Sequence, residues 1–295
     1  MWIRELITIP TGCPTLRCIS NGWSRTGEAL QELSSSPIAQ GRTAEIYAWD
    51  DEHILKLYRE WCPPDWADYE ARIARAVYES GIPSPEAGEI IEVDGRRGLI
   101  YERLEGVSML KDMNARPWML LKHARSLAEL HVQIHRQSLT DLPFYKDRLG
   151  YDIRNNPHLS EKLKNKALAL LENLPNGETL CHGDFHPDNV LITKKGPVVI
   201  DWMTACIGSP WTDVARTSLI LSIGAKSAGK QVRPILRAVV HLYHRTYLHR
   251  YQALKPDRTG EFAGWMPVIA AARGNENIIP EREALIKIVE AGFAE

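Results

Sequence analysis

A short polar loop in the second half of the chain carries the residue types that phosphoryl transfer requires. Residues 181–189 read Cys-His-Gly-Asp-Phe-His-Pro-Asp-Asn, which puts Asp184 and Asn189 five positions apart, and the apolar strand that follows ends in Asp201. One carboxylate can orient an attacking hydroxyl and accept its proton, while a second carboxylate and an amide oxygen hold Mg²⁺ against nucleotide phosphates. Mg²⁺ keeps several of its waters, so one Asp and one Asn suffice as protein ligands. A turn with a capping Asp is the alternative for any one of these residues, but the whole set favours phosphoryl transfer.

This loop resembles the Brenner-type catalytic loop of the aminoglycoside phosphotransferases and of their choline, homoserine and fructosamine kinase relatives. Ile-Asp-Trp at 200–202 resembles the metal-binding strand of that family, and Gly-Ser-Pro-Trp-Thr-Asp at 208–213 resembles its downstream motif. The resemblance covers about residues 38 to 290. It implies a protein-kinase-like fold that uses ATP or GTP to phosphorylate a hydroxyl of a small molecule.

The resemblance also implies a role for each matching residue. Asp184 matches the catalytic base, and Asn189 and Asp201 match the Mg²⁺ ligands. His182 matches the structural histidine of the loop, which we interpret as a scaffold hydrogen-bonder. Asp213 matches a buried carboxylate that braces the loop; an acid at a helix N-terminus is the alternative for it.

A lysine in the first third is the expected contact to the nucleotide phosphates. Lys56 lies in the middle of a predicted strand between apolar neighbours, where an ammonium without a partner is costly. Glu70, on the following predicted helix, is its natural partner, and Glu79 is a weaker alternative. In kinase-like proteins the matching Lys and Glu direct the ammonium at the α- and β-phosphates. An edge-strand lysine that faces water is the other interpretation.

Two further segments of the first third are expected to contact the nucleotide through backbone groups. Gly41 and Thr43 lie where a phosphate-covering loop belongs, although this loop has one glycine and not the three of protein kinases. No P-loop motif is present. Residues 100–104 resemble the hinge that hydrogen-bonds adenine, through backbone groups of Glu102 and Leu104.

The elements that must position these residues change from strands to helices along the chain. The predicted strands are 44–49, 54–58, 89–93 and 98–101, with a hairpin turn at Asp94-Gly95. A further hairpin turn is predicted at 194–196. The predicted helices are 66–80, 117–136, 160–173 and most of 211–294. We therefore expect an α+β protein with a protein-kinase-like, two-lobed fold. A β-rich nucleotide-binding lobe is predicted at residues 1–104, and a mainly helical catalytic and substrate-binding lobe at 105–295.

Composition excludes several other classes of protein. Hydrophobic residues make up 44% and charged residues 25%, as in ordinary globular proteins, and the formal net charge of −1 predicts no nucleic-acid partner. No stretch approaches the ~18 apolar residues of a membrane span, and the first ten residues show no secretory signal. We therefore expect a cytoplasmic location and no membrane partner. Free thiols fit this compartment; the cysteines are Cys13, Cys18, Cys62, Cys181 and Cys206.

The acceptor is expected to be a small hydroxylated molecule. The short distance from Asp201 to Asp213 leaves no room for a long activation segment, which disfavours a protein kinase. A basic stripe in the predicted helix 231–251 is interpreted as a solvated face, with attraction of an anionic acceptor as the alternative. Its members are Arg233, Arg237, His241, Arg245 and His249. The rival functions are a non-catalytic nucleotide-binding pseudokinase and a structural binder without nucleotide; the oligomeric state stays open.

Overall fold

The computed structural model describes residues 36–227, 234–257 and 260–294, which form two compact units. The N-terminal unit holds the described residues up to Gly106 together with Thr193–Met203. The C-terminal unit holds Val107–Ile192 and the described residues from Thr204 onward. The predicted lobe boundary between residues 104 and 105 stays a prediction. The N-terminal compact unit also contains the segment 193–203, which comes later in the chain. Three residues named in the sequence analysis, Cys13, Cys18 and Arg233, lie outside the described residues.

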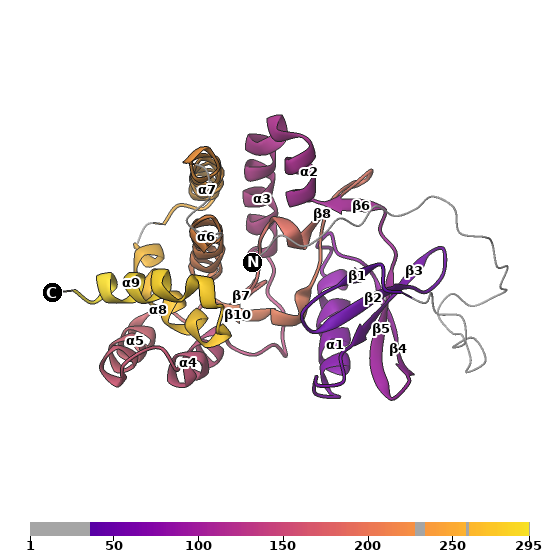
Figure 1. Cartoon of the computed structure of the whole chain (residues 1–295), viewed down its shortest axis with the longest axis horizontal. Helices are drawn as coiled ribbons and strands as arrows, with labels where there is room; N and C mark the ends of the chain where they lie inside the picture. Colours follow the sequence, from indigo (N-terminus) through magenta and orange to yellow (C-terminus); the bar gives the residue numbers. More distant parts are fainter. Residues whose placement is uncertain (1–35, 228–233, 258–259, 295) are drawn as a thin grey trace. The chain divides into compact units, whose positions relative to one another are not determined.

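A five-stranded antiparallel sheet forms the N-terminal unit, in the order β1-β2-β3-β5-β4 (Figure 1). Its strands are β1 (Ala39–Gln40), β2 (Ala44–Ala48), β3 (His53–Tyr58), β4 (Ala87–Val93) and β5 (Arg96–Glu102). The predicted hairpin at Asp94-Gly95 is confirmed, because both residues adopt the positive φ that a two-residue hairpin turn needs. At the β2–β3 turn, the Asp50 carboxylate accepts the backbone N–H groups of Glu52 and His53.

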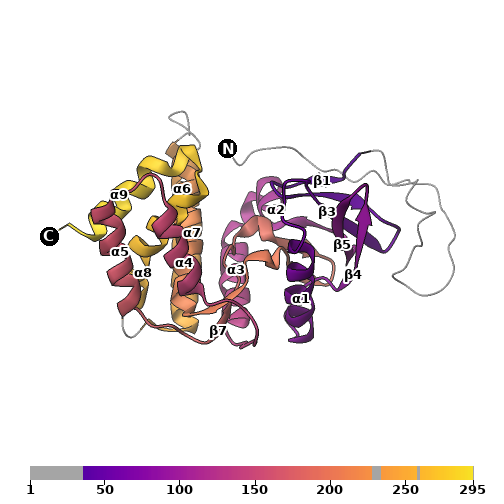
Figure 2. The ribbon, with the colours of Figure 1, turned by 90° about the horizontal axis from the view of Figure 1, so that it is seen from below.

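Helix α1 (Trp66–Glu79) covers one face of this sheet (Figures 1 and 2). Side chains alternate between the faces of a strand, so Leu55 and Leu57 of β3 pack with Ile100 on the face away from the helix. Ile54 and Tyr58 lie on the helix side. Lys56 shares that side, which brings its ammonium toward α1.

The C-terminal unit is mainly helical (Figure 2). Its helices are α2 (Met109–Ala115), α3 (Leu120–Ile134), α4 (Tyr145–Asn155), α5 (Glu161–Asn173), α6 (Pro210–Ser227), α7 (Pro234–Leu254), α8 (Glu261–Arg273) and α9 (Arg282–Gly292). Helix α3 packs against α7, and α8 packs against α4, α5, α6 and α9. The predicted helices 117–136 and 160–173 are confirmed, the first beginning with a 3-10 turn at Pro117–Met119 and the second capped by the Ser160 hydroxyl.

Short strands flank the polar loop of residues 182–189. Strand β7 (Thr179–Cys181) pairs antiparallel with β10 (Cys206–Gly208), so the residue before the loop lies opposite Cys206. The other short strands are β6 (Gly106–Ser108), β8 (Val190–Thr193) and β9 (Gly196–Val199). The predicted turn after β8 is confirmed, because the Thr193 hydroxyl accepts the Lys195 N–H and donates to the Gly196 carbonyl.

Several surface and core assignments follow from burial. Trp202, Trp211 and Trp265 are buried, so they are core residues rather than an aromatic wall for a ligand. The described members of the basic stripe, Arg237, His241, Arg245 and His249, are exposed.

None of the helices in the described ranges is both long and apolar enough to cross a membrane. The expected α+β class, a β-rich N-terminal part and a mainly helical C-terminal part, is confirmed.

Candidate active site

Asp213 fixes the backbone of the polar loop. It lies in the first turn of α6 and is fully buried. Its Oδ2 accepts the His182 N–H at 2.6 Å and its Oδ1 accepts the Gly183 N–H at 3.0 Å, as the bracing role predicts. Gly183 has φ of +76°, and a Cβ there would come within 2.3 Å of the Thr204 carbonyl oxygen. Only glycine therefore fits the residue that precedes Asp184 without moving the loop.

Two histidines one helical turn apart, His131 on α3 and His135 at its C-terminal end, hold Asp213 in place. Their Nε2 atoms lie 3.1 Å (His131) and 3.4 Å (His135) from Asp213 Oδ2, and their Nδ1 atoms each lie 2.7 Å from a tyrosine hydroxyl of α7, Tyr247 and Tyr251. Burial works against the charged carboxylate, but the hydrogen bonds from both histidines outweigh it, and the pKa of Asp213 lies well below its usual range. Burial and the neighbouring His131 lower the pKa of His135 to about 3, so this ring is neutral near pH 7.

This cluster was missed from sequence, where the tyrosines of α7 read as an apolar stripe. The available signal was the matched spacing of two His on one helix and two Tyr on another. The donor atoms of His131, His135 and Asp213 lie close enough together to hold a metal ion. Each already has a hydrogen-bond partner inside the fold, so we interpret the group as a polar brace.

Asp184 lies between a buried arginine and a histidine. Its Oδ1 is 3.1 Å from Nη2 of Arg216, and its Oδ2 is 3.5 Å from Nε2 of His186. Its own N–H donates to Nδ1 of His182 at 3.3 Å, which fits the predicted scaffold role of that histidine. Burial raises the pKa of the Asp184 carboxyl, but the His186 hydrogen bond and the Arg216 charge outweigh this and hold that pKa below its usual range. Asp184 is therefore ionised near pH 7 and can accept a hydrogen bond from a hydroxyl.

Asn189 is the last residue of the loop, and its side-chain amide hydrogen-bonds to the backbone of the loop. Its Nδ2 donates to the Asp184 backbone carbonyl at 2.9 Å. Because the amide nitrogen is used in this way, the side-chain oxygen is the atom that can face a hard cation. The neighbouring Asp188 bonds instead to the hydroxyl of Ser108, which caps α2.

Lys56, on β3 of the N-terminal unit, is ion-paired with two carboxylates. Nζ of Lys56 lies 2.8 Å from Oε1 of Glu70 and 3.0 Å from Oδ1 of Asp201. Glu70 is buried and also accepts the hydroxyls of Tyr58 and Tyr101. Burial lowers the pKa of Lys56, but the Asp201 and Glu70 charges more than compensate, so its ammonium stays charged. The predicted Lys56–Glu70 pair is confirmed.

Asp201 combines exposure with an uncommon backbone conformation. Its side chain is half-exposed, and its φ is +65°, in the left-handed region that non-glycine residues seldom adopt. Such conformations cost about 1–3 kcal/mol and cluster at functional sites. An exposed carboxylate is a hard oxygen donor of the kind that Mg²⁺ prefers.

The remaining predicted nucleotide contacts lie in short backbone segments. The Gly41 N–H donates to the Ala44 carbonyl, so a phosphate contact through that group would have to replace this bond. Thr43 lies in the same turn, and its carbonyl accepts the Arg59 N–H. The Glu102 N–H donates to the Glu86 carbonyl, so an adenine contact through that N–H would have to replace this bond. Roles for Gly41, Thr43, Glu102 and Leu104 in nucleotide binding stay predictions.

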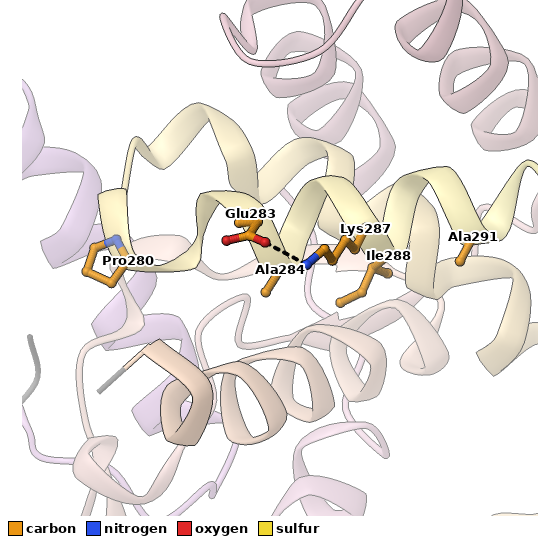
Figure 3. Close-up of a pocket in the computed structure, with 6 residues that line it drawn as sticks. All are labelled: Pro280, Glu283, Ala284, Lys287, Ile288 and Ala291. Atoms are coloured by element: carbon orange, nitrogen blue, oxygen red, sulfur yellow. Dashed lines mark hydrogen bonds and ion pairs between the residues drawn. The ribbon is translucent and has the colours of Figure 1, made fainter. Parts of the chain in front are cut away.

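A surface hollow of the C-terminal unit lies on α9 (Figure 3). Glu283 and Lys287 form an ion pair across one turn of the helix there. The other lining residues are Pro280, Ala284, Ile288 and Ala291. None of the residues predicted for catalysis lines this hollow, so we assign it no part in phosphoryl transfer.

Comparison with curated proteins gives distant relatives. Acyl-CoA dehydrogenase family member 11 of Pongo abelii is 26% identical over 214 residues, which cover 60% of this chain and 27% of that protein. The Homo sapiens protein of the same name is 27% identical over 179 residues, which cover 52% of this chain and 23% of that protein. The chain thus matches about a quarter of the length of these relatives.

Solved structures share the fold at low identity. A thermostable mutant of aminoglycoside phosphotransferase APH(4)-Ia in its apo form has a TM-score of 0.63 and 18% identity, covering 91% of this chain and 98% of that chain. A ternary complex of such a mutant with AMP-PNP and hygromycin B also has a TM-score of 0.63, at 17% identity, covering 91% and 97%. A choline/ethanolamine kinase family protein from Mesorhizobium loti has a TM-score of 0.55 and 15% identity, covering 91% and 92%.

The family match extends over most of the chain. The model of the phosphotransferase enzyme family (APH) matches residues 34–254, which include the polar loop, Asp201 and Asp213. The chain therefore belongs to the phosphotransferase enzyme family and has the protein-kinase-like fold of aminoglycoside phosphotransferases and choline kinases.

Proposed function

We propose that this protein transfers the γ-phosphoryl group of ATP or GTP to a hydroxyl of a small molecule, with Asp184 as the catalytic base. The observation that carries the proposal is the setting of Asp184: a partly exposed carboxylate that pairs with the buried Arg216, in a loop that a buried acid fixes. The family match and the kinase-like neighbours support a small-molecule phosphotransferase.

The residues divide the work of an in-line displacement. The acceptor hydroxyl donates a hydrogen bond to Asp184 and attacks the γ-phosphorus, the bond from that phosphorus to the leaving nucleoside diphosphate breaks, and the proton passes to the carboxylate. Asp184 is a weak base because its pKa is low, so orientation is its larger contribution. Lys56, held by Glu70, directs its charge at the α- and β-phosphates. Asn189 and Asp201 are the residues that would hold Mg²⁺, whose charge would offset that of the phosphates.

The acceptor class stays open between two groups of structural neighbours. One neighbour is an aminoglycoside phosphotransferase in complex with hygromycin B, and another belongs to the choline/ethanolamine kinase family. Both are below 25% identity, so they support the fold and not a choice of acceptor.

The described cysteines, Cys62, Cys181 and Cys206, are buried free thiols, which supports our expectation of the cytoplasm.

Nucleotide turnover against a panel of acceptors tests the proposal. The panel holds aminoglycosides, macrolides, choline, ethanolamine, homoserine and several sugars, with Mg²⁺ and ATP or GTP, and Asp184→Asn serves as the blank. We expect release of ADP or GDP that depends on one acceptor class and is absent from the blank. Binding of MgATP without turnover on any acceptor would favour a pseudokinase instead.

A further inference from the structure

One nitrogen of Arg216 joins the predicted base to a second carboxylate. Nη2 of Arg216 lies 3.1 Å from Oδ1 of Asp184 and 2.8 Å from Oε1 of Glu276. Arg216 lies on α6 and is buried, whereas the two carboxylates are each about one quarter exposed. The guanidinium thus lies between two negative charges, that of Asp184 in the loop and that of Glu276.

The turn that carries Glu276 is held firmly from inside. Glu276 ends a 3-10 turn, Gly274–Glu276, directly after α8. Arg273 reaches Glu276 at 3.3 Å and also forms a two-point pair with the buried Glu281, at 2.7 and 3.1 Å. Asn275 donates to Asp152 of α4 at 2.9 Å. Glu276 is therefore fixed relative to α4 and α8 before it meets Arg216.

This turn lies beyond the part of the chain that the family model matches. That match ends at residue 254, whereas the turn occupies residues 274–276. The Asp184–Arg216–Glu276 contacts thus include a residue that lies outside the family match. Arg216 is inside the matched region, three positions after Asp213 on α6.

We infer that Arg216 and Glu276 are positioning residues for Asp184, and that the turn 274–276 is part of the active site. The inference rests on the proposed function, and it concerns how the base is held. Glu276 fixes the guanidinium of Arg216, and the guanidinium fixes one oxygen of Asp184. The other oxygen, 3.5 Å from His186, is then directed toward the acceptor hydroxyl.

Two physical arguments favour positioning over simple stabilisation of the fold. The buried Arg273–Glu281 pair already connects the turn to the core. The contact from Arg216 to Asp184 is therefore not required to hold the turn in place. Loss of the Arg216 contacts would leave Asp184 and Glu276 as neighbouring, uncompensated carboxylates, which would push the loop away from its working geometry. A displacement of about 1 Å at a reacting group can cost about 100-fold in rate.

The test uses the full chain with Arg216→Lys and Glu276→Gln, and with Glu129→Gln as the control. Glu129 is a carboxylate of the same unit that pairs with an arginine, Arg250, outside this network. The first measurement is hydrogen exchange of the peptide that covers residues 181–189, which needs no acceptor. The second is kcat and KM for MgATP with the acceptor that the panel identifies.

We expect at least about tenfold faster exchange of the loop in Arg216→Lys and Glu276→Gln, and exchange at the wild-type rate in Glu129→Gln. We also expect kcat to fall roughly 10- to 100-fold in the first two variants, with KM for MgATP within about threefold of wild type. Unchanged loop exchange, or an equal effect in Glu129→Gln, would overturn the inference. If the wild type phosphorylates no acceptor, the proposed function fails, and the exchange measurement alone still decides whether the pair holds the loop.

Discussion

Lys56 and Asp201 form a 3.0 Å ion pair although 145 positions separate them in the chain. Both residues belong to the N-terminal compact unit, which includes residues 193–203. The Val199 N–H adds a backbone bond to the Pro83 carbonyl, just before the segment that carries Asp201. A candidate metal ligand is thus paired with the lysine that we propose binds phosphate.

The metal role of Asp201 predicts a loss of affinity that depends on Mg²⁺. Asp201→Ala removes a hard oxygen ligand, so we expect MgATP binding to weaken at least about tenfold. Calorimetry with ATP in the presence and absence of Mg²⁺ measures this. An equal loss in metal-free buffer would mean that Asp201 acts only through Lys56.

Glu70 and Glu79, both on α1, provide a matched pair for the lysine contact. Glu70→Gln removes the charge that holds Lys56, so we expect about tenfold weaker MgATP binding, the value of one charge-assisted hydrogen bond. Glu79 is exposed, and Glu79→Gln should leave the affinity unchanged. Calorimetry on both variants decides; equal affinities would exclude Glu70 from nucleotide binding.

The close approach at Gly183 predicts a large cost for a single methyl group. Gly183→Ala must accept both a φ of +76° and a Cβ that collides with the Thr204 carbonyl oxygen. Gly260, in the same unit, has φ of +73° and no atom within 4 Å of its ideal Cβ, so Gly260→Ala reports the backbone cost alone.

We expect Gly260→Ala to lower the free energy of unfolding by about 1–2 kcal/mol, and Gly183→Ala to lower it by at least about 2 kcal/mol more. Urea denaturation of the two variants measures the difference. Equal costs would show that the loop relaxes around the methyl group.

The neutral ring of His135 predicts how stability changes with pH. Its pKa is about 3 in the folded protein and ordinarily 6.5, so between these values the unfolded chain binds the extra proton. Stability contributed by His135 is therefore full above pH 6.5 and falls as the pH drops toward 3, by up to about 1.4 kcal/mol per pH unit.

His135→Gln removes this titration. We expect the variant to be less stable than wild type at pH 7, because the bonds to Asp213 and Tyr251 change, and to lose less stability on acidification to pH 4. Denaturant unfolding at both pH values measures this. A parallel loss in the two proteins would show that His135 is protonated in the folded state.

The site residues that the sequence predicted are marked by patterns in the few residues around them. Lys56 stands out because its strand neighbours are apolar, and Asp184, Asn189 and Asp213 stand out through the spacing of the loop and of the segment after it. The elements were predictable for the same reason: strand alternation and helical period are local. Each of these residues could be singled out from the few positions of chain around it.

The parts that were missed depend on contacts between distant segments. Arg216 and Glu276 meet across 60 positions, and nothing near either residue indicates the other. The hydroxyls of Tyr247 and Tyr251 bond to histidines 116 positions away, and the helical period near either segment does not indicate these bonds. Backbone strain at Asp201 is likewise a property of the folded chain alone.

The central claim is that Asp184 is the catalytic base, and Asp184→Ala tests it most directly. The measurement is turnover with the acceptor that the panel identifies, together with MgATP affinity by calorimetry. We predict that turnover is abolished while MgATP affinity stays within a few-fold of wild type, because the carboxylate acts on the acceptor and not on the nucleotide. Near-wild-type turnover in the variant would contradict the account.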